Sequence, residues 1–405
     1  MSADVKSLSD SHVMNTYRRY QATFVDGSGM YLYDASGKKY LDFVAGIAVV
    51  SLGHSHPKVT EAVSSQIKRL AHVSNLYYTE PMARLAEKLC DLLGWEDGRV
   101  FFCNSGAEAN ECAIKLVRKR SRLDFGKGRF ETIATFDSFH GRTLETLAAT
   151  GQPKKWEPFT PLPPGFRHVS YDDLTALEEA VDDSVCSVLL EPVQGEGGVV
   201  VPSPDYLPGV RKICDAHDLG FIADEVQTGL GRTGEWFGFQ ESGAVPDIIT
   251  LAKALGNGLP IGACVARGDH AEAFEPGDHA TTLGGGPVVC AAALAVLDTL
   301  ENEGLIPRAK EIGKYLGALL DGLNGSHSSV IGIRGKGLLL AVQLSGDFAR
   351  KVAEDCLEQG LLINDVGPSA LRLCPPLIVE EEQCTKAMSI LSEVLSKFDG
   401  DEVPS

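Results

Sequence analysis

Three features that mark whole classes of protein are missing from this sequence of 405 residues: paired cysteines, long apolar runs and a targeting segment. Its ten cysteines form no C-x-x-C pair and no dense cluster, which argues against a disulfide framework or a zinc site and favours reduced, packed thiols. The longest apolar stretch, near residues 288–297, is far shorter than the ~20 residues of a membrane span. The N-terminus has neither a signal-peptide core nor the acid-poor character of a transit peptide. We therefore expect a soluble, cytoplasmic protein.

Positive charge is also scarce. The chain has 37 Lys and Arg against 55 Asp and Glu, a formal net charge of −18, so its average surface repels phosphate backbones and anionic membranes. We expect neither a nucleic-acid partner nor a membrane partner. Small anionic substrates remain open, provided that a local arginine or a helix N-terminus overcomes that field.

Several motifs of known chemistry are absent: the P-loop G-x-x-x-x-G-K-[ST], the nucleophile elbow G-x-S-x-G and the zinc motif H-E-x-x-H. Residues 229–234 do fit the dinucleotide fingerprint G-x-G-x-x-G, but residues 235–239 are a poor start for a phosphate-binding helix. We interpret the segment as a loop and keep a nicotinamide-dependent dehydrogenase as an alternative. His54 and His56 have no third ligand nearby, which favours a turn and no metal site.

The pattern of apolar residues predicts the fold class. Alternating residues over 30–34 and 40–43 predict a short β-hairpin. Helical spacing over 57–71 and 80–93 is followed by a repeated order of apolar run, polar tip and amphipathic helix, which predicts an α/β fold with a mainly parallel, doubly wound sheet. The ligand site of such a sheet lies at the carboxyl ends of its strands. The expected strands are 100–103, 132–136, 185–190, 220–223, 248–251 and 262–266, and the expected helices among them are 109–120, 174–181 and 207–216.

At roughly 100–200 residues per domain, a chain of this length should form two or three compact units. We expect an N-terminal segment over 1–60, a large domain over 61–304 and a smaller α+β domain over 305–405. A helix near 288–303 and a loop at 321–326 mark the passage into the smaller domain.

The first polar tip, residues 104–108, follows an apolar run and precedes an expected helix. Ser105 and Glu108 have the spacing of a capping box, so a well-capped helix is the plain interpretation. Gly106 adds a second one, because a residue without Cβ lets a phosphate approach the free N–H groups at the positive end of the helix dipole. The tip therefore indicates a site for a phosphate-bearing ligand.

Later tips place charged and aromatic side chains at further strand ends. Taken singly, Phe139 and Arg142 are a core aromatic and a surface charge, but together they suit a flat ligand that carries a carboxylate. The acidic residues within 189–198 and Asp224 follow buried strands, where an ionised carboxylate needs a cationic partner. Two such acids at neighbouring strand ends indicate a site that compensates the charge of a bound ligand. Lys253 is a surface lysine by default, yet a desolvated lysine has a lowered pKa and attacks carbonyls.

The ordered set of tips resembles the class III, pyridoxal-phosphate-dependent aminotransferases of fold type I, over a range from residues 40–49 to residues 371–377. The resemblance implies a large cofactor domain and a small α+β domain built from the N- and C-terminal parts of the chain. It also implies pyridoxal 5′-phosphate as cofactor, amino acids and 2-oxo acids as substrates, a ping-pong exchange of an amino group and a homodimer.

The same resemblance implies roles for named residues. Lys253 would hold the cofactor covalently and act as the catalytic base, and Asp224 would pair with the protonated ring nitrogen. Thr282 would contact the phosphate of the other subunit's cofactor. The other expected cofactor-binding residues are Ser105, Gly106 and Ala107 at the phosphate, Phe139 stacked on the ring, His140, Val226 beneath the ring and Gln227 at its phenolic oxygen. Val50 and Gly286 depart from the residues usual in this family.

Three residues, Arg142, Glu196 and Arg372, resemble the substrate-binding set of the N-acetylornithine aminotransferases. In that arrangement Arg142 binds the α-carboxylate of the acylated donor while Glu196 neutralises Arg372; Glu196 then swings away and Arg372 takes the α-carboxylate of 2-oxoglutarate. Ile47 stands in place of the tyrosine of ornithine δ-aminotransferases, which favours an acylated substrate. The expected reaction is amino transfer from N2-acetylornithine to 2-oxoglutarate. The alternatives are succinylornithine, carrier-linked lysine, ornithine or 4-aminobutyrate aminotransferases and a glutamate-1-semialdehyde aminomutase.

Overall fold

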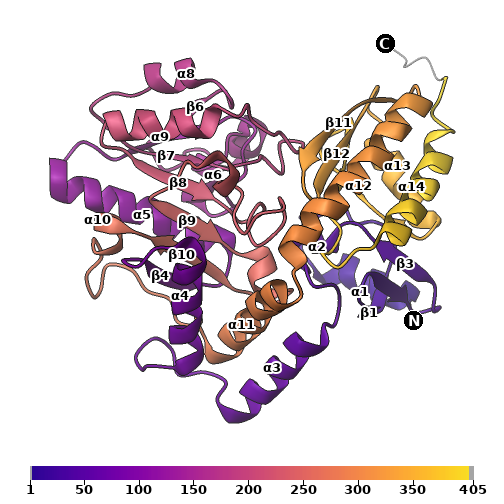
Figure 1. Ribbon diagram of the computed structural model, residues 1–405, viewed down its shortest axis with the longest axis horizontal. Helices are drawn as coiled ribbons and strands as arrows, with labels where there is room; N and C mark the ends of the chain where they lie inside the picture. Colours follow the sequence, from indigo (N-terminus) through magenta and orange to yellow (C-terminus); the bar gives the residue numbers. More distant parts are fainter. Residues whose placement is uncertain (1, 401–405) are drawn as a thin grey trace.

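A computed structural model describes residues 2–400 of the chain, and Figure 1 shows two lobes, each built around β-structure. The larger lobe holds a seven-stranded sheet with the strand order β4-β10-β9-β8-β7-β5-β6. Strands β9, β8, β7, β5 and β6 pair in parallel, whereas β10 pairs antiparallel with both β9 and β4. The predicted mainly parallel sheet is confirmed.

The strands of this sheet are β4 (Arg99–Cys103), β5 (Glu131–Thr135), β6 (Phe166–Val169), β7 (Val185–Leu190), β8 (Gly220–Asp224), β9 (Ile248–Leu251) and β10 (Gly262–Ala266). All are expected from the sequence except β6, which lies at the sheet edge. The α-helices of this lobe are α3 (Pro57–Arg69), α4 (Glu80–Leu93), α5 (Gly106–Phe125), α6 (Leu144–Ala149), α7 (Pro153–Trp156), α8 (Leu174–Glu179), α9 (Tyr206–Ala216), α10 (Gly268–Ala271) and α11 (Pro287–Asn302).

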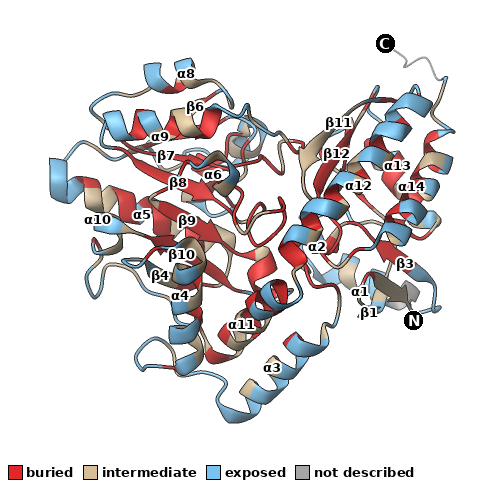
Figure 2. Cartoon of the chain, in the orientation of Figure 1, coloured by how far each residue is buried: buried red, intermediate tan, exposed pale blue. Residues whose placement is uncertain are grey.

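Helices cover both faces of the large sheet, because its central strands are apolar on both sides. Every residue of β7 and β8 is buried. Phe221 of β8 belongs to the core that contains Val210 of α9, while the next residue, Ile222, belongs to the core that contains Ile114 of α5. Figure 2 shows the buried strands in red between helices whose outer faces are exposed. This burial on two faces explains the near-continuous apolar runs in the sequence.

The smaller lobe contains two four-stranded sheets that join both ends of the chain. One sheet has the order β1-β2-β3-β13 and the other β11-β12-β15-β14. The N-terminal hairpin β2–β3 pairs through β3, in parallel, with β13 near the C-terminus. The strands are β1 (Phe24–Ser28), β2 (Tyr31–Asp34), β3 (Lys39–Asp42), β11 (Val330–Lys336), β12 (Leu339–Leu344), β13 (Leu361–Leu362), β14 (Asn364–Asp365) and β15 (Ala370–Leu373). The helices outside the larger lobe are α1 (Ser2–His12), α2 (Ala45–Ala48), α12 (Leu305–Ser326), α13 (Ala349–Glu358) and α14 (Glu381–Leu395).

The expected loop at 321–326 is wrong, because these residues form the end of α12. Leu316, Leu320 and Leu323 are buried at helical spacing and hold the last turns against the core. A Cβ added at Gly322 or Gly325 would meet no atom within 4 Å, so neighbouring atoms do not require glycine at either position. Tertiary burial of the leucines outweighs the weak helix propensity of the glycines. The domain boundaries near residues 60 and 305 stay a prediction.

Three other expectations concern single features. All ten cysteines are free thiols, and nine of them are buried. Residues 229–234 lie in turns between β8 and β9, as interpreted from the sequence. His54 Nε2 lies 2.7 Å from Asp42 Oδ2, so this histidine stabilises the N-terminal segment.

Within residues 2–400, no helix has the length and apolar character needed to cross a membrane.

Candidate active site

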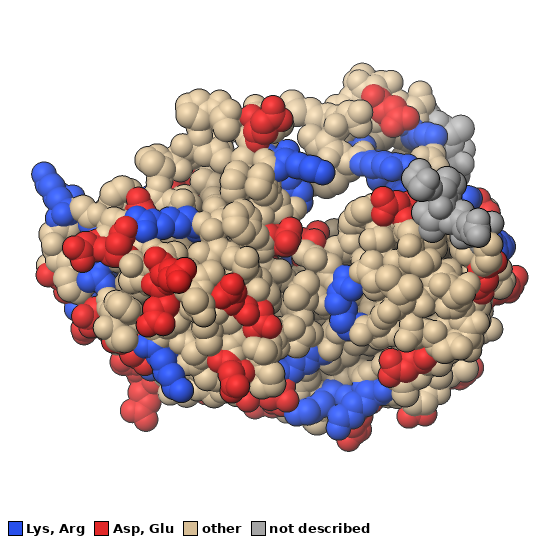
Figure 3. All heavy atoms as spheres, turned by 90° about the horizontal axis from the view of Figure 1, so that it is seen from above, with Lys and Arg blue, Asp and Glu red and all other residues tan. Residues whose placement is uncertain are grey.

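A cavity of about 450 Å³ lies at the carboxyl ends of the central strands of the large sheet. It collects residues that follow β4, β5, β8 and β9, together with the start of α5. Nine residues predicted from the sequence line it: Ser105, Gly106, Ala107, Phe139, His140, Arg142, Asp224, Val226 and Lys253. Figure 3 shows that the surface of the molecule is hollowed between the two lobes.

The start of α5 forms one wall of the cavity. The Ser105 side chain caps the helix and accepts from Glu108 N at 3.2 Å, while Glu108 Oε2 accepts from Asn104 N at 2.6 Å. The first N–H groups of a helix lack intrahelical acceptors and point outward from its N-terminus. A Cβ at Gly106 would lie 2.9 Å from Val226 Cγ1, so only glycine fits beneath that side chain. The geometry therefore suits an anion held by backbone N–H groups.

Asp224, at the end of β8, is 3% exposed and is held in place by three donors. Its Oδ2 accepts from Asn110 Nδ2 at 2.7 Å and lies 2.8 Å from His140 Nδ1, and its Oδ1 accepts from Val226 N at 3.0 Å. Since a carboxylate oxygen only accepts, His140 carries a proton on Nδ1. His140 Nε2 is buried without a partner among the described residues. These contacts fix the position and orientation of the Asp224 carboxyl group.

Sequence reasoning missed Asn110, which contributes the shortest of those contacts. Its Oδ1 accepts from Thr250 Oγ1 of β9 at 2.7 Å, so the amide orientation is fixed from both sides. Asn110 stands four residues after Gly106 and therefore shares its helix face. That spacing in a helix-opening motif is the sequence signal that would have found it.

Lys253 stands two residues after the end of β9, is partly buried and lines the cavity. Burial lowers the pKa of its ammonium; the negative charges of Glu196 and Asp224 oppose this effect, and Arg372 adds to it. Its backbone has φ of 41°, in the left-handed region that non-glycine residues rarely adopt. Strain of this kind persists where the surrounding structure enforces it, which is common at functional sites.

Arg372 and Glu196 form an ion pair next to Lys253. Arg372 Nη1 donates to Glu196 Oε1 at 2.5 Å and to Gln227 Oε1 at 3.0 Å, and only 1% of Arg372 is exposed. Burial alone would raise the pKa of Glu196, but Arg372 and Lys253 hold it down to about 2. The structure thus brings together the three predicted residues Glu196, Gln227 and Arg372, which come from distant parts of the chain.

The loop that carries Phe139 and Arg142 follows β5. The guanidinium carbon of Arg142 lies 5.0 Å from the centroid of the Phe139 ring. Glu191, fully buried, accepts from Phe139 N and from Gly195 N, each at 3.0 Å, and so ties this loop to the one that carries Glu196. Burial raises the pKa of Glu191 to about 7.

Thr282 is exposed and does not line the cavity, so the chain by itself does not bring it to the other predicted residues. Its loop is held by Asn75, whose Nδ2 donates to Thr281 O and Gly284 O, both at 3.0 Å. The contact of Thr282 with a second subunit stays a prediction. Gly286 has φ of −58° as the N-cap of α11, an ordinary backbone conformation that does not require glycine.

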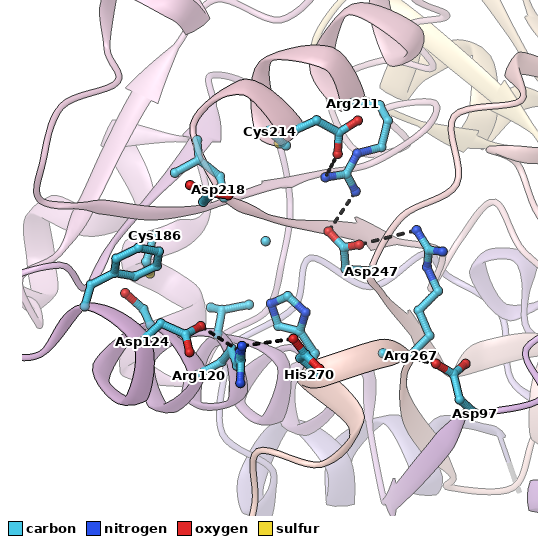
Figure 4. A pocket seen from close by; sticks show the side chains of 18 residues that line it. Asp97, Arg120, Asp124, Cys186, Arg211, Cys214, Asp218, Asp247, Arg267 and His270 are labelled. Carbon is cyan, nitrogen blue, oxygen red and sulfur yellow. Dashed lines mark hydrogen bonds and ion pairs between the residues drawn. The ribbon is translucent and has the colours of Figure 1, made fainter.

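A second cavity, of about 420 Å³, lies at the opposite end of the same sheet (Figure 4). Arg211 pairs with Asp247 at 2.7 Å and with Asp215 at 2.8 Å, and Arg267 approaches Asp247 at 3.4 Å. Arg120 pairs with Asp124 and Asp269 at 2.7 and 3.0 Å. Each arginine of this cavity therefore has a carboxylate partner within the chain.

The sequence matches a known protein family and named relatives. The family model described as Aminotransferase class-III matches residues 13–395. An acetylornithine aminotransferase from Caldanaerobacter subterraneus subsp. tengcongensis is 50% identical over 387 residues, covering 96% of this chain and 98% of that protein.

Solved structures are similar over the same range. The structure of the Toxoplasma gondii ornithine aminotransferase described as having partial occupancy of PLP at its active site has a TM-score of 0.93, 32% identity and coverage of 98% of this chain and 96% of that one. An acetylornithine aminotransferase structure from Elizabethkingia anophelis has a TM-score of 0.88, 33% identity and coverage of 98% and 99%. A family match over nearly the whole chain, with a lysine and a buried carboxylate in one cavity, shows that this protein belongs to the class III aminotransferases.

Proposed function

We propose that this protein catalyses acetylornithine aminotransfer with pyridoxal 5′-phosphate as cofactor. It would move the δ-amino group of N2-acetylornithine reversibly to 2-oxoglutarate, giving N-acetylglutamate 5-semialdehyde and glutamate, a step of arginine biosynthesis. The observation that carries the proposal is the presence of Lys253 in one cavity with the buried Asp224 and the start of α5. The 50% identity to a protein named acetylornithine aminotransferase supports the choice of donor.

The residues present fit this cofactor. Gly106 leaves no room for a Cβ and opens a helix, which suits a phosphate, so Ser105, Gly106 and Ala107 would hold that group. Phe139 and Val226 would pack against the two faces of the ring, and Gln227 Nε2 would donate to its phenolic oxygen. When bound, pyridoxal 5′-phosphate serves as a sink for the electrons released from the substrate carbon.

Asp224 and Lys253 would act on protons in this reaction. Asp224, held in place by its contacts with Asn110, His140 and Val226 N, would pair with a protonated ring nitrogen. The lowered pKa of Lys253 raises the fraction of neutral amine, which can attack a carbonyl and accept a proton. Lys253 Nζ would take the proton from the amine-bearing carbon of the donor and return one to the acceptor.

Substrate selection would use the remaining charged residues. Arg142 would bind the α-carboxylate of N2-acetylornithine while Glu196 covers Arg372. When 2-oxoglutarate enters, Glu196 would rotate away and leave Arg372 for the α-carboxylate, which accepts two N–H bonds from a guanidinium. The 2.5 Å ion pair and the Gln227 contact support a resting state in which Arg372 is neutralised.

We further propose a homodimer in which Thr282 of each subunit reaches the cofactor phosphate of the other. The exposure of Thr282 and its position outside the cavity of its own chain are consistent with this role. A cytoplasmic location is also part of the proposal, since ten free thiols suit a reducing compartment.

The test combines adduct mapping with a donor panel. Borohydride reduction of the holoenzyme followed by peptide mass mapping should place the pyridoxyl group on Lys253. With 2-oxoglutarate as acceptor, N2-acetylornithine should be used more efficiently than N2-succinylornithine, ornithine or 4-aminobutyrate. An adduct elsewhere would reject the mechanism, and turnover without any 2-oxo acid would indicate an aminomutase instead.

A further inference from the structure

A cation outside the predicted site residues lies beside the cavity. Lys155, in the short helix α7, places its Nζ 5.6 Å from the centroid of the Phe139 ring, the same ring that Arg142 approaches at 5.0 Å. Lys155 is half-buried, whereas its neighbour Lys154 is exposed. Two positive charges therefore converge on one aromatic ring at the edge of the site.

The turn that carries Lys155 is held against the loop that carries Phe139. Gln152 Nε2 donates to Ser138 O at 2.9 Å, and Gly151 N donates to Ser138 Oγ at 3.0 Å. Trp156 Nε1 donates to Thr150 O at 2.5 Å. These bonds hold the backbone on both sides of Lys155 in place next to the Phe139 loop.

Within residues 2–400, neither cation is paired with a carboxylate. Among the described residues, Arg142 and Lys155 take part in no ion pair within 4.0 Å, in contrast to the arginines of the second cavity. Burial and the charge of Arg142 lower the pKa of Lys155, and the one nearby acid that opposes this effect is Glu196. Glu196, however, is already bound to Arg372 at 2.5 Å. Like charges held together without a counter-ion create a local potential that favours an anionic ligand.

We propose that Lys155 is a specificity-determining, substrate-binding residue that acts together with Arg142. The two cations form one recognition site for the carboxylate at the end of the substrate remote from the reacting carbon. This inference rests on the proposed aminotransferase function, and it assigns Lys155 a preference for dicarboxylic over monocarboxylic 2-oxo acids. Lys155 adds charge that Arg142 alone does not supply, so its loss weakens binding without changing the chemical step.

The experiment compares Lys155→Met with the matched control Lys154→Met, because both remove one lysine from the same turn. With 2-oxoglutarate at low ionic strength, we expect Lys155→Met to raise KM about five- to tenfold and to leave kcat within about twofold. The efficiency with 2-oxobutanoate, which has a single carboxylate, should not change. Lys154→Met should match wild type with both acceptors, and Lys155→Arg should keep most of the affinity for 2-oxoglutarate.

A second measurement does not depend on turnover. Calorimetric titration of the cofactor-free protein with glutarate should show a dissociation constant about five- to tenfold higher for Lys155→Met than for Lys154→Met. Equal glutarate affinity in the two variants, equal losses with both acceptors, or no glutarate binding by wild type would overturn the proposal. Failure of wild type to transfer an amino group to any 2-oxo acid would reject the proposed function instead, and the glutarate titration would still test Lys155.

Discussion

The two ends of the seven-stranded sheet differ in how many of their cations have a carboxylate partner. At the end shown in Figure 4, Arg120, Arg211 and Arg267 each have a carboxylate partner, and Asp247 serves two of them. At the carboxyl ends of the parallel strands, Arg372 is paired with Glu196, but Lys253 and Arg142 form no ion pair with the described residues. Removing one member of an ion pair within the chain leaves an uncompensated charge and costs stability, whereas charges left unpaired in a cavity remain available to a ligand.

The largest effect should come from the unpaired end. We expect Lys253→Ala to lower kcat by at least about 1,000-fold, because no other described side chain offers an amine at the centre of the cavity. Turnover with saturating N2-acetylornithine measures the loss, and circular dichroism checks that the fold is kept. Full activity of this variant would show that the unpaired lysine at this end is not needed for the reaction.

A substitution at the paired end should act on stability instead. Asp247→Asn removes the charge that faces Arg211 and Arg267 and weakens an acceptor of Phe221 N. We expect a loss of about 2–4 kcal/mol in the free energy of unfolding, measured in urea, with kcat unchanged at a temperature where the variant is folded. A large fall in kcat without loss of stability would show that this end also takes part in function.

Glu191 gives a test that depends on pH. Its pKa of about 7 is above the 4.5 of an ordinary glutamate, so the folded state binds this proton more tightly than the unfolded state does. The stability contributed by this proton is complete below about pH 4.5 and is lost as the pH rises through 7. Between about pH 5 and pH 8, wild type should lose about 1–3 kcal/mol more unfolding free energy than Glu191→Gln, which cannot release the proton. Parallel stability curves for the two proteins would contradict this assignment.

The smallest effect should come from a partly exposed pair at the opposite end. Arg120 has 28% of its side chain exposed, and its partners lie on the same helix and in α10. We expect Arg120→Met to cost less than about 1 kcal/mol of unfolding free energy. The KM values for N2-acetylornithine and for 2-oxoglutarate should stay at the wild-type level. A rise in the KM for 2-oxoglutarate comparable to that of Lys155→Met would mean that the overall charge of the protein affects substrate binding more than the position of a cation does.

Sequence reasoning located the site because its signals are local. The apolar runs before residues 104, 224 and 253 indicate buried strands, and polar residues directly after such strands fall at one edge of a parallel sheet. The prediction failed where tertiary packing outweighs the local sequence signals. The glycines near the end of α12 suggested a loop, although buried leucines keep that segment helical. Asn110 and Lys155 carry no strand-end signal of their own, so their contribution was not predicted.

The amino-acid sequence alone determined the order of strands and helices and the residue types at the strand ends, because periodicity and capping act over a few neighbouring residues. Only the tertiary structure decided which of those residues meet. Arg372 and Glu196 are 176 positions apart, and Asn110 and Asp224 are 114 apart, yet each pair is in contact. Tertiary structure also decided which cations have partners, since burial and pairing depend on how distant segments pack and not on any local pattern.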